Sequence, residues 1–420
     1  AREHALAWRL RQSSLLTGLW VASGNAGTAA IATNLSVDPE DLDGLAAAAR
    51  SLRIDLVVVG PEGPLAHGLV DRLTALGIPA FGPSKAAAQL EASKSFALEL
   101  MQEASVPHPR SWVFREQQEA VAFLAKHPGP WVVKADGLAA GKGVSLCRTS
   151  AEAAAAVRAC MTERVFGPAG ETVVIQELLQ GTEVSVFAFS DGEHLSAPVA
   201  ACDYKRLRDG DAGPNTGGMG SFAWPGFWTD ALAEEITRCI MRPVIQGMAD
   251  RGTPFRGVLY AGLMLTDQGP KVLEFNCRWG DPEAQVVLPL LDSDPLEVMV
   301  ACLEGRLAQT PVSWQKGACV GVVMASGGYP AQYDTGFEIT GLDTMDENSL
   351  ISIPTQSLIF HAGTRLIQEG GQRGVLTGGG RVLTVVGRGN SLAEARQRAY
   401  DRVRGVSFHN AIYRADIALA

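Results

Sequence analysis

Residues 56–83 carry a strand–helix–strand pattern that restricts the fold of this chain more than any other segment. Residues 56–60 form a continuous aliphatic run, which is typical of a strand buried on both faces of a sheet. Leucines then recur every three or four residues over 65–76, as expected for one face of a helix, and a short apolar segment follows at 77–83. This order predicts a parallel sheet with a helix packed against it.

A second strand, at 271–275, leads directly into a series of polar side chains. Because alternate residues of a strand point to the same face, Glu274, Asn276 and Arg278 are expected to lie on one side. Carboxylate and amide oxygens suit Mg²⁺, and a neighbouring arginine suits a phosphoryl or carboxylate group. The segment therefore predicts a site for a metal–phosphate complex; the alternative is a surface strand with a solvated polar face.

The composition excludes several classes of protein. A chain of 420 residues, 46% of them hydrophobic, can form two or more cored domains. The net charge of −9 argues against a nucleic-acid-binding protein, and neither a membrane span nor a secretory signal is expected. The seven cysteines are scattered without a C-x-x-C pair, which indicates reduced thiols in the cytoplasm. The seven histidines form no H-x-x-x-H pair, so a zinc enzyme is not expected.

Residues 131–146 predict a β-hairpin whose connection is rich in glycine. Lys134 ends its first strand, and a lysine at the end of a buried strand requires an anionic partner. A phosphate is a natural partner, and the N–H groups of the loop Gly141-Lys142-Gly143 add to its binding. The spacing fits neither a Walker A loop nor a dinucleotide fingerprint. A flexible surface hairpin is the alternative.

Glu177, Leu178 and Leu179 follow the next predicted strand. A strand end of this kind can offer an apolar slot and backbone groups to an adenine ring, and Glu183 can accept hydrogen bonds from ribose hydroxyls. An ordinary strand and turn would have the same sequence, so both interpretations stay open here.

The connection over 203–220 is long, polar and rich in glycine. Such a loop usually has a function in a compact enzyme. Lys205 and Arg206, together with free backbone N–H groups, suit an anionic substrate or an acyl phosphate. A disordered linker is the alternative.

Other patterns indicate how the rest of the chain is organised. Residues 86–130 are expected to be mostly helical, and a helix over 230–248 has an apolar residue at every fourth position. Towards the C-terminus, strands at 319–324 and 381–386 and a helix capped by Ser391 indicate a last, smaller α+β unit.

Together these segments resemble the ATP-grasp ligases, and among them the phosphoribosylamine–glycine ligase family. The resemblance extends over essentially the whole chain, in order, and rests on residues 2–8, 59–62, 81–84, 134–143, 211–220, 280–283 and 325–330. It implies a multidomain α/β and α+β protein with the ATP-grasp fold. The implied parts are an N-terminal parallel α/β domain at 1–92, an ATP-grasp region at 93–315 with a small ATP lid at about 112–178, and a C-terminal α+β domain at 316–420.

The resemblance also implies an activity. The carboxylate of glycine attacks the γ-phosphate of ATP to give glycyl phosphate and ADP, and the amine of 5-phosphoribosylamine then displaces phosphate. The product is glycinamide ribonucleotide, in the second step of de novo purine synthesis. The implied cofactors are ATP and Mg²⁺ or Mn²⁺. The implied assembly is a monomer or weak dimer that contacts neighbouring purine-pathway enzymes transiently, with no nucleic acid or membrane as partner.

Site residues are carried over onto the matching positions. The catalytic candidates are Arg278, Lys205 and Asp281. The ATP candidates are Lys94, Lys134, Gly141, Lys142, Gly143, Glu177, Leu178, Leu179 and Glu183. The metal candidates are Glu274 and Asn276. The substrate candidates are Arg2, Glu3, His4, Gly60, Pro61, Glu62, Asp203, Arg206, Asn215, Thr216, Gly217, Gly218 and Met219. Of these, residues 2–5 would bind the ribose phosphate at a helix N-terminus, and Asp281 and Asn215 would contact glycine.

The sequence departs from the family pattern at two points. The family implies a short glycine-rich segment before Ala1 that completes the phosphate cradle. Many ATP-grasp enzymes also carry an acidic metal ligand on the strand before the metal site, but residues 260–264 have none, so two protein ligands are expected. With no residue after Ala420, a chain with one function is expected.

Two other functions remain as alternatives. One is another ATP-grasp carboxylate ligase or carboxylase with a different acceptor, against which the run at 213–220 argues. The other is a non-catalytic nucleotide sensor, but such a protein would be expected to have lost one of Lys134, Glu274, Asn276 and Arg278.

Overall fold

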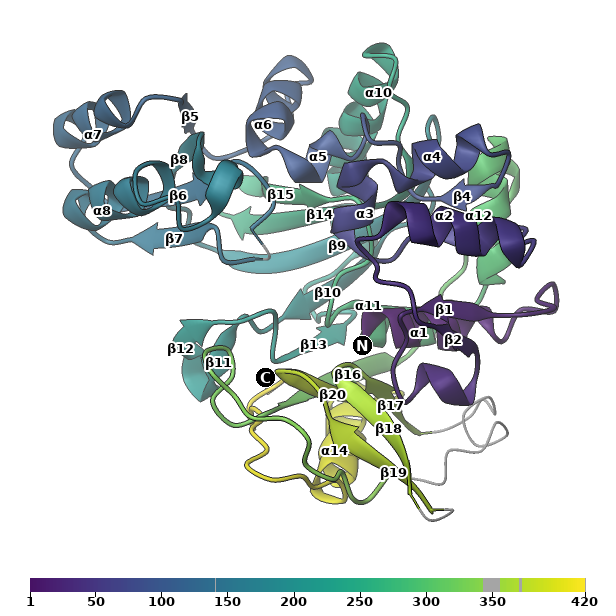
Figure 1. Cartoon of the computed structure of the whole chain (residues 1–420). Helices are drawn as coiled ribbons and strands as arrows, with labels where there is room; N and C mark the ends of the chain where they lie inside the picture. Colours follow the sequence, from purple (N-terminus) through teal and green to yellow (C-terminus); the bar gives the residue numbers. More distant parts are fainter. Residues whose placement is uncertain (140, 343–355, 370–371, 420) are drawn as a thin grey trace.

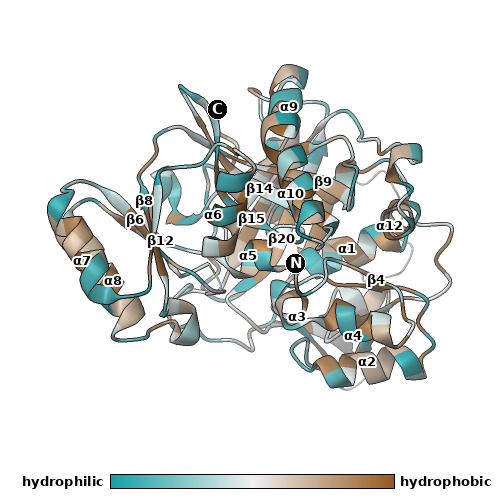
Figure 2. Ribbon diagram, turned by 90° about the horizontal axis from the view of Figure 1, so that it is seen from above, coloured by the Kyte–Doolittle hydropathy of each residue, from teal (hydrophilic) through white to brown (hydrophobic). Residues whose placement is uncertain are grey.

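The computed structural model describes residues 1–139, 141–342, 356–369 and 372–419, and its central feature is a sheet of eight strands (Figure 1). Within the described ranges the strand order is β15-β14-β9-β10-β13-β16-β20-β17, and each neighbouring pair is antiparallel. The strands are β9 (Thr182–Asp191), β10 (Val199–Asp203), β13 (Gly220–Ala223), β14 (Arg256–Thr266), β15 (Gly269–Asn276), β16 (Ala318–Ala325), β17 (Ser357–His361) and β20 (Arg381–Gly389). Hydrophobic residues gather on strands in the middle of the molecule (Figure 2).

This sheet joins two parts of the chain that the sequence patterns separate. β13 follows the glycine-rich connection and pairs with β16, with Ser221 opposite Gly321. β16 then pairs with β20. The strands predicted at 319–324 and 381–386 are therefore confirmed, but they extend the central sheet instead of forming one of their own. The predicted domain boundaries stay predictions.

The C-terminal part adds a helix and a hairpin to the sheet. Helix α14 (Leu392–Arg404) packs against β16 and β20. Its cap is the predicted one, because the Ser391 hydroxyl accepts the Glu394 N–H at 3.2 Å. Strands β18 (Thr364–Glu369) and β19 (Gln372–Thr377) pair antiparallel and form a separate two-stranded sheet.

The parallel unit predicted over 56–83 is confirmed, in a shortened form. Strand β3 (Val57–Val58) pairs parallel with β4 (Ala80–Phe81), but both valines are only half-buried. The helix between them is divided into α3 (Glu62–His67) and α4 (Leu69–Ala75), because Gly68 adopts a left-handed φ of 89°.

Around this unit lie the remaining N-terminal elements. They are α1 (Arg2–Leu10), β1 (Trp20–Ala22), the 3₁₀ turn η1 (Thr28–Ala30), β2 (Thr33–Leu35) and α2 (Leu42–Ser51). Strands β1 and β2 form a second parallel pair. Helix α1 is buried at every residue except Glu3, so it is a core helix of the whole molecule.

The ATP lid predicted from the sequence corresponds to a four-stranded antiparallel sheet with its own hydrophobic core. Its strands, in the order β5-β8-β6-β7, are β5 (Ser111–Phe114), β8 (Val173–Glu177), β6 (Trp131–Ala135) and β7 (Val144–Cys147). Helices α7 (Gln117–Lys126) and α8 (Ser150–Met161) cover the sheet, and the unit projects to the left of the central sheet (Figure 1). The hairpin predicted over 131–146 is confirmed by the pairing of β6 with β7.

The helix predicted over 230–248 is a continuous helical run with a π segment in its middle. It comprises α9 (Asp230–Ile236), the π segment η4 (Thr237–Met241) and α10 (Arg242–Asp250). Apolar residues at every fourth position drift away from one face of an α-helix of 3.6 residues per turn. The wider π turn reduces this drift, so that Ile236, Ile240, Val244 and Met248 are all fully buried.

Shorter elements connect these units. They are α5 (Gln89–Ala92), α6 (Lys94–Glu103), η2 (Gly167–Gly170), β11 (Arg206–Arg208), η3 (Asp209–Asp211), β12 (Ala212–Asn215), α11 (Ala284–Val287), η5 (Leu288–Leu290), α12 (Pro295–Glu304) and η6 (Leu307–Gln309). Both α5 and α6 contact β15, the strand that carries the predicted metal site. Among the described residues, no helix has the length and apolar character needed to cross a membrane.

Candidate active site

The end of β15 brings the predicted metal and phosphate side chains together. Nη2 of Arg278 donates to Oδ1 of Asn276 at 3.2 Å, as expected for side chains on one side of the strand end. Burial favours a higher pKa for Glu274, but the charges of Lys205, Lys134, Lys94 and Arg278 outweigh it and lower that pKa. Glu274 is therefore an ionised carboxylate among four cations. Such a donor set of hard oxygens fits a divalent cation, and the surplus positive charge fits phosphates.

Two of these cations come from opposite sides of the predicted loop. Lys134 is 6% exposed at the end of β6, and its Nζ donates to the carbonyl of Leu273 on β15 at 2.7 Å. Nζ of Lys94, at the start of α6, donates to the carbonyl of Gly137 at 3.2 Å. Burial lowers the pKa of both lysines, that of Lys134 to about 8. Carbonyl oxygens carry no net charge, so both ammonium groups remain available to an anion.

The glycine-rich loop is anchored to α6 at one end. The Asp136 carboxylate accepts from the N–H of Ser95 at 2.6 Å and from its hydroxyl at 2.9 Å. Gly141 has φ of 73°, and a Cβ on Gly143 would lie 2.8 Å from that of Ala139. Lys142 is exposed near the loop tip, and Ala140 of the predicted closing segment lies outside the described residues.

Part of the strand end predicted to bind adenine makes another contact within the protein. Glu177 accepts from the N–H and Nε of Arg110 at 3.0 and 2.7 Å, and its own N–H donates to the Arg110 carbonyl. Leu178, by contrast, is 38% exposed and Leu179 is half-buried, so an apolar surface is open at this strand end. Glu183 pairs with Lys205 at 2.6 Å.

The predicted substrate segments of the N-terminal part converge on Arg278. Arg2 pairs with Glu3 at 2.7 Å and lies 3.7 Å from Glu62, and Glu62 lies 3.2 Å from Nε of Arg278. Gly60 lies beside Glu3, since a Cβ there would be 3.3 Å from the Glu3 carboxylate. Pro61 precedes the first residue of α3. Residues far apart in the sequence thus form one charged network.

His4 lies away from this network. Its Nδ1 accepts the N–H of His361 at 2.9 Å, and its ring packs edge-on against Phe360. Burial lowers the pKa of His4 well below the usual value, so the ring is neutral. The structure therefore places this predicted substrate residue in the packing of α1 against β17.

Asp281 lies at the junction of three parts of the chain. Its carboxylate accepts from the N–H of Arg2 at 3.4 Å and from Nε2 of Gln285 at 2.6 Å, and it pairs with Arg381 at 3.3 Å. Burial opposes its ionisation, but the charges of Arg381 and Arg2 hold its pKa well below the usual value. In this structure a carboxylate of the protein itself faces the N-terminus of α1, where a ribose phosphate is predicted. The predicted contacts of Asp281 with glycine and of α1 with phosphate stay predictions.

The connection over 203–220 is an ordered hairpin, so the alternative of a disordered linker is wrong. Arg206 donates to the carbonyl of Gly213 at 2.8 Å, and Asn215 pairs with Arg206 across β11 and β12. Thr216 donates to the carbonyl of Lys205 at 2.9 Å. Asn215 is exposed on this hairpin.

The glycine-rich end of the hairpin is held by the C-terminal part. Gly217 donates its N–H to the Tyr329 hydroxyl at 3.0 Å and accepts from Arg381 at 2.5 Å. Gly218 has φ of 104°. Met219 is fully buried, and its N–H donates to the backbone carbonyl of Tyr204. These contacts fix the backbone of the predicted substrate loop.

Asp203, at the end of β10, lies among other carboxylates. Burial raises its pKa to about 7 against the opposing charge of Lys205, and the carboxylates of Glu283, Glu183 and Glu274 add to the rise. Lys205 therefore lies among several carboxylates of this region, and it pairs directly with Glu183.

Several residues of the site were not predicted from the sequence. Glu91 binds Arg278, Arg381 binds Asp281, and Glu283 accepts from the Tyr260 hydroxyl at 2.9 Å. Glu91 had one local signal, as a charged residue in the otherwise apolar or neutral segment 86–92. Arg381 stands at the start of a strand, where arginine is unremarkable, so no local signal identifies it.

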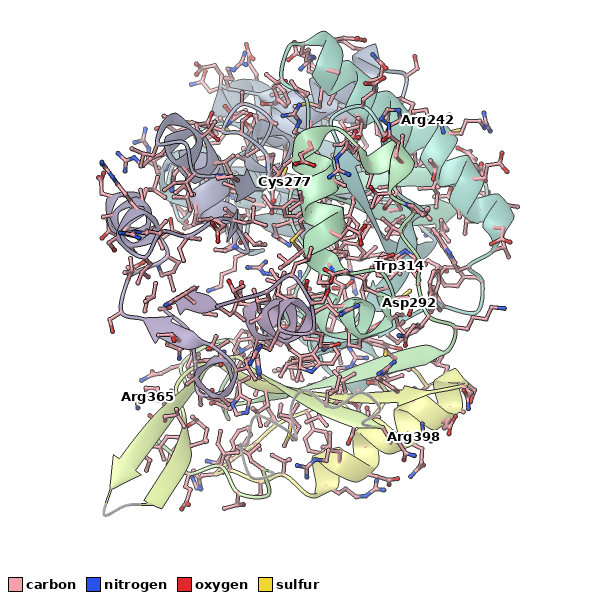
Figure 3. The ribbon with its side chains drawn as sticks, turned by 90° about the vertical axis from the view of Figure 1, so that its right-hand side faces the viewer. Arg242, Cys277, Asp292, Trp314, Arg365 and Arg398 are labelled. Atoms are coloured by element: carbon pink, nitrogen blue, oxygen red, sulfur yellow. The ribbon has the colours of Figure 1, made fainter. Side chains whose placement is uncertain are left out.

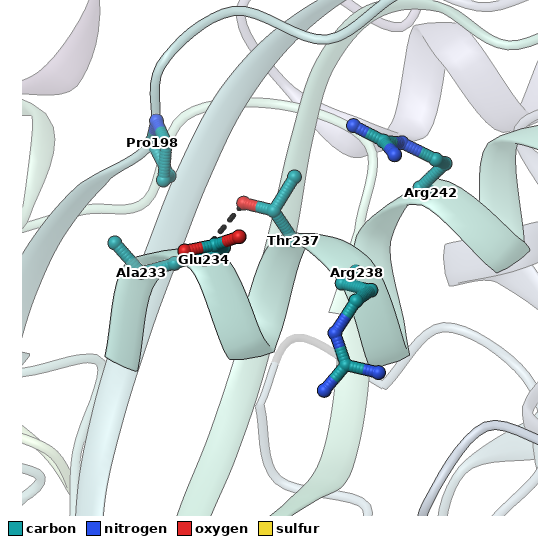
Figure 4. Close-up of a pocket in the computed structure, with 6 residues that line it drawn as sticks. All are labelled: Pro198, Ala233, Glu234, Thr237, Arg238 and Arg242. Carbon is teal, nitrogen blue, oxygen red and sulfur yellow. Dashed lines mark hydrogen bonds between the residues drawn. The ribbon is translucent and has the colours of Figure 1, made fainter. Parts of the chain in front are cut away.

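Two hollows lie away from these residues. A cavity of about 210 Å³ is lined by Pro198, Ala233, Glu234, Thr237, Arg238 and Arg242, and Thr237 there donates to the carbonyl of Ala233 (Figure 4). A groove of about 850 Å³ lies between α2 and α4. Neither hollow includes a residue predicted for the site.

Comparison with known proteins identifies the family of this chain. Residues 1–91, 92–284 and 319–420 match the N domain, the ATP-grasp (A) domain and the C domain of phosphoribosylglycinamide synthetase. The phosphoribosylamine–glycine ligase of Caldanaerobacter subterraneus subsp. tengcongensis is 43% identical over 99% of this chain and 97% of its own length. The trifunctional purine biosynthetic protein adenosine-3 of Gallus gallus is 48% identical over 99% of this chain and 41% of its own length. A crystal structure of a phosphoribosylamine–glycine ligase from Thermotoga maritima is 32% identical over 99% of this chain and 97% of that one, with a TM-score of 0.81. This chain therefore belongs to the phosphoribosylglycinamide synthetase family and has the ATP-grasp fold.

Proposed function

We propose that this protein joins glycine to 5-phosphoribosylamine at the expense of ATP and releases glycinamide ribonucleotide, ADP and phosphate. The observation that carries the proposal is the cluster at the end of β15, where Glu274 lies among four cations, of which Lys134 is buried, and Asn276 accepts from Arg278. Two of the relatives named above, from Caldanaerobacter subterraneus and Thermotoga maritima, are phosphoribosylamine–glycine ligases that this chain matches over 97% of their length.

The chemistry requires neutralisation of charge more than covalent help from the protein. A carboxylate is a poor acyl donor, so an oxygen of the glycine carboxylate attacks the γ-phosphorus and ADP leaves. The amine of phosphoribosylamine then attacks the carbonyl carbon, phosphate leaves and the amine loses a proton. Lys134 and Lys94 bind the ATP phosphates, and Arg278 neutralises the glycine carboxylate or the acyl phosphate. The loop over 139–143 closes on the phosphates and excludes water, which protects the acyl phosphate from hydrolysis.

Glu274 and Asn276 would hold the divalent cation, Mg²⁺ or Mn²⁺. Such an ion would supply positive charge that offsets the negative charge of the phosphoryl group in transfer. With two oxygen ligands from the protein, the ion would complete its shell with phosphate and water oxygens.

The remaining partners follow from the same proposal. Arg2, Glu3, Glu62 and Arg206 lie on segments that would hold phosphoribosylamine, and the backbone of 215–219 would face glycine. Transient contact with other purine-pathway enzymes is supported by the chicken relative, in which a similar region is part of a trifunctional protein. A cytoplasmic location is proposed, since all seven cysteines are free and six of them are buried. The assembly as a monomer or weak dimer stays a prediction.

The decisive experiment measures ADP release by the purified protein with Mg-ATP and glycine, with and without freshly generated phosphoribosylamine. Release that requires both glycine and phosphoribosylamine is the expected result. Release without the amine, or only with another acceptor, would favour the carboxylase or ligase alternative. ATP binding without any release would favour a nucleotide sensor.

A further inference from the structure

Glu91 lies beside the end of β15 and belongs to none of the groups assigned above. It stands on the short helix α5 and is 9% exposed. Its Oε2 accepts the N–H of Cys277 at 2.7 Å, and its Oε1 accepts Nη2 of Arg278 at 2.8 Å. Figure 3 shows Cys277 within the body of the molecule. One buried carboxylate therefore binds the two residues that directly follow Asn276.

The contact continues from Arg278 to the predicted metal ligand. The same Nη2 that binds Glu91 also donates to Oδ1 of Asn276 at 3.2 Å. An amide oxygen has two lone pairs, so a hydrogen bond to one of them fixes the direction of the other. Glu91 thus orients Arg278, and Arg278 orients the amide oxygen that would bind the cation. Groups that orient metal ligands in this way tune metal affinity strongly.

The need to neutralise the guanidinium of Arg278 does not by itself explain why a carboxylate stands at position 91. Glu62 already lies 3.2 Å from Nε of Arg278, but these two groups are not aligned for a hydrogen bond. The contact with Glu62 therefore neutralises the charge of Arg278 but does not orient its side chain. Burial raises the pKa of Glu91, and a second buried carboxylate costs free energy of desolvation. Glu91 differs from Glu62 in making two directed hydrogen bonds, which indicates a role in orientation.

We propose that Glu91 is a positioning residue that holds Arg278 and, through it, turns Oδ1 of Asn276 towards the divalent cation of the bound nucleotide. The proposal deepens the function proposed above and rests on it, because it requires a metal–nucleotide complex at the end of β15.

The test measures the affinity for Mn²⁺ in the presence of a non-hydrolysable ATP analogue by titration calorimetry, together with ADP release. E91Q removes the charge while keeping the shape, and is expected to weaken metal binding by about 10- to 100-fold. The matched control is E103Q, which breaks the exposed pair of Glu103 with Arg251 and is expected to bind the metal as the wild type does.

The E91Q change in a second variant, R278M, distinguishes a positioning role of Glu91 from a general structural role. In R278M, the E91Q change is expected to cost little further metal affinity, because Glu91 acts through Arg278. Equal losses in both backgrounds would overturn the proposal. If E91Q does not unfold cooperatively, E91D makes the same comparison with the charge retained on a shorter side chain, and metal affinity equal to the wild type would overturn the proposal.

The same titration distinguishes this proposal from the proposed function. A wild-type protein that binds no metal–nucleotide complex would overturn both. A wild-type protein that binds the complex, with E91Q binding it equally well, would overturn only the role of Glu91.

Discussion

Lys134 carries a buried ammonium group that donates a hydrogen bond to a neutral acceptor, the carbonyl oxygen of Leu273 on β15, at 2.7 Å. Burial lowers its pKa to about 8, so the lysine is close to losing its proton near physiological pH. A bound phosphate would add its negative charge to that of Glu274 and stabilise the ammonium form of Lys134. The electrostatics of this one residue therefore link nucleotide binding to pH.

Replacing Lys134 with methionine is expected to weaken ATP binding by about 10- to 100-fold, because a charge-assisted hydrogen bond to phosphate is lost. Wild-type affinity is also expected to fall as the pH rises through about 8, and the variant should lack this dependence. Calorimetric titration with ATP between pH 6.5 and 9 checks both outcomes. K126M, at an exposed lysine of the same lid, is the control. Unchanged affinity in K134M would remove Lys134 from the phosphate site.

The pair His4 and His361 predicts a pH dependence of stability. Burial lowers the pKa of both rings, that of His361 to about 4, whereas an unfolded histidine titrates near 6.5. The unfolded chain therefore binds more protons below pH 6.5, and the free energy of unfolding is expected to fall between pH 6.5 and 4.

Replacing His4 with asparagine keeps an acceptor for the His361 N–H and removes one titrating ring. Denaturant unfolding at several pH values should show a smaller loss of stability on acidification than in the wild type. H67N, at an exposed histidine, should leave the wild-type slope unchanged. An unchanged slope in H4N would contradict the assigned burial of a neutral ring.

Among the elements, the hairpin of β11 and β12 shows how an ordered loop is held by backbone contacts. Gly218 needs a positive φ, and a Cβ there would lie 2.4 Å from Cδ of Pro282. The loop therefore stays close to the segment 280–283 only because residue 218 lacks a side chain. In the helical run over 230–250, the backbone likewise adapts to the sequence, because the π segment compensates for apolar residues placed at every fourth position.

Gly218→Ala is expected to displace the substrate loop and to lower kcat/KM for glycine by at least about tenfold, a change of about 1.4 kcal/mol. Gly226→Ala is the matched control, because a Cβ on Gly226 would meet no atom within 4 Å. Steady-state kinetics with glycine as the varied substrate provide the measurement. Equal kinetics for the two variants would show that the close approach to Pro282 is not required.

For the whole molecule, Arg381 connects the C-terminal part to the site. It pairs with the Asp281 carboxylate and donates to the carbonyls of Asp281 at 2.8 Å and of Gly217 at 2.5 Å. Because Asp281 also accepts from the start of α1, one arginine joins three distant parts of the chain.

Arg381→Met is expected to lower the free energy of unfolding by about 2 kcal/mol, because it removes the charged hydrogen bonds and the ion pair that Arg381 makes with the partly buried Asp281. Activity should fall as well, since Gly217 loses its anchor. Arg404→Met is the control, because the exposed Arg404 pairs with Asp401 on the same helix, α14. Denaturant unfolding followed by two spectroscopic probes measures the effect, and equal stability of the two variants would contradict a role for Arg381 as a connection.

The sequence alone determined the features that depend on local chemistry. Alternation along β15 places Asn276 and Arg278 on one side, the apolar runs of 131–146 predict the hairpin, and the pattern over 56–83 predicts the parallel pair. These predictions succeed because side-chain period and turn chemistry act over a few residues.

Only the tertiary structure decided which distant residues complete the site. Glu91 and Arg278 lie 187 positions apart, and Arg381 lies 100 positions from Asp281. Nothing in the local sequence around these residues specifies the contacts, because they result from the packing of α5 on β15 and from the pairing of β16 with both β13 and β20. For the same reason the packing of His4 against β17 could not be predicted, since the burial of α1 was not visible in its sequence.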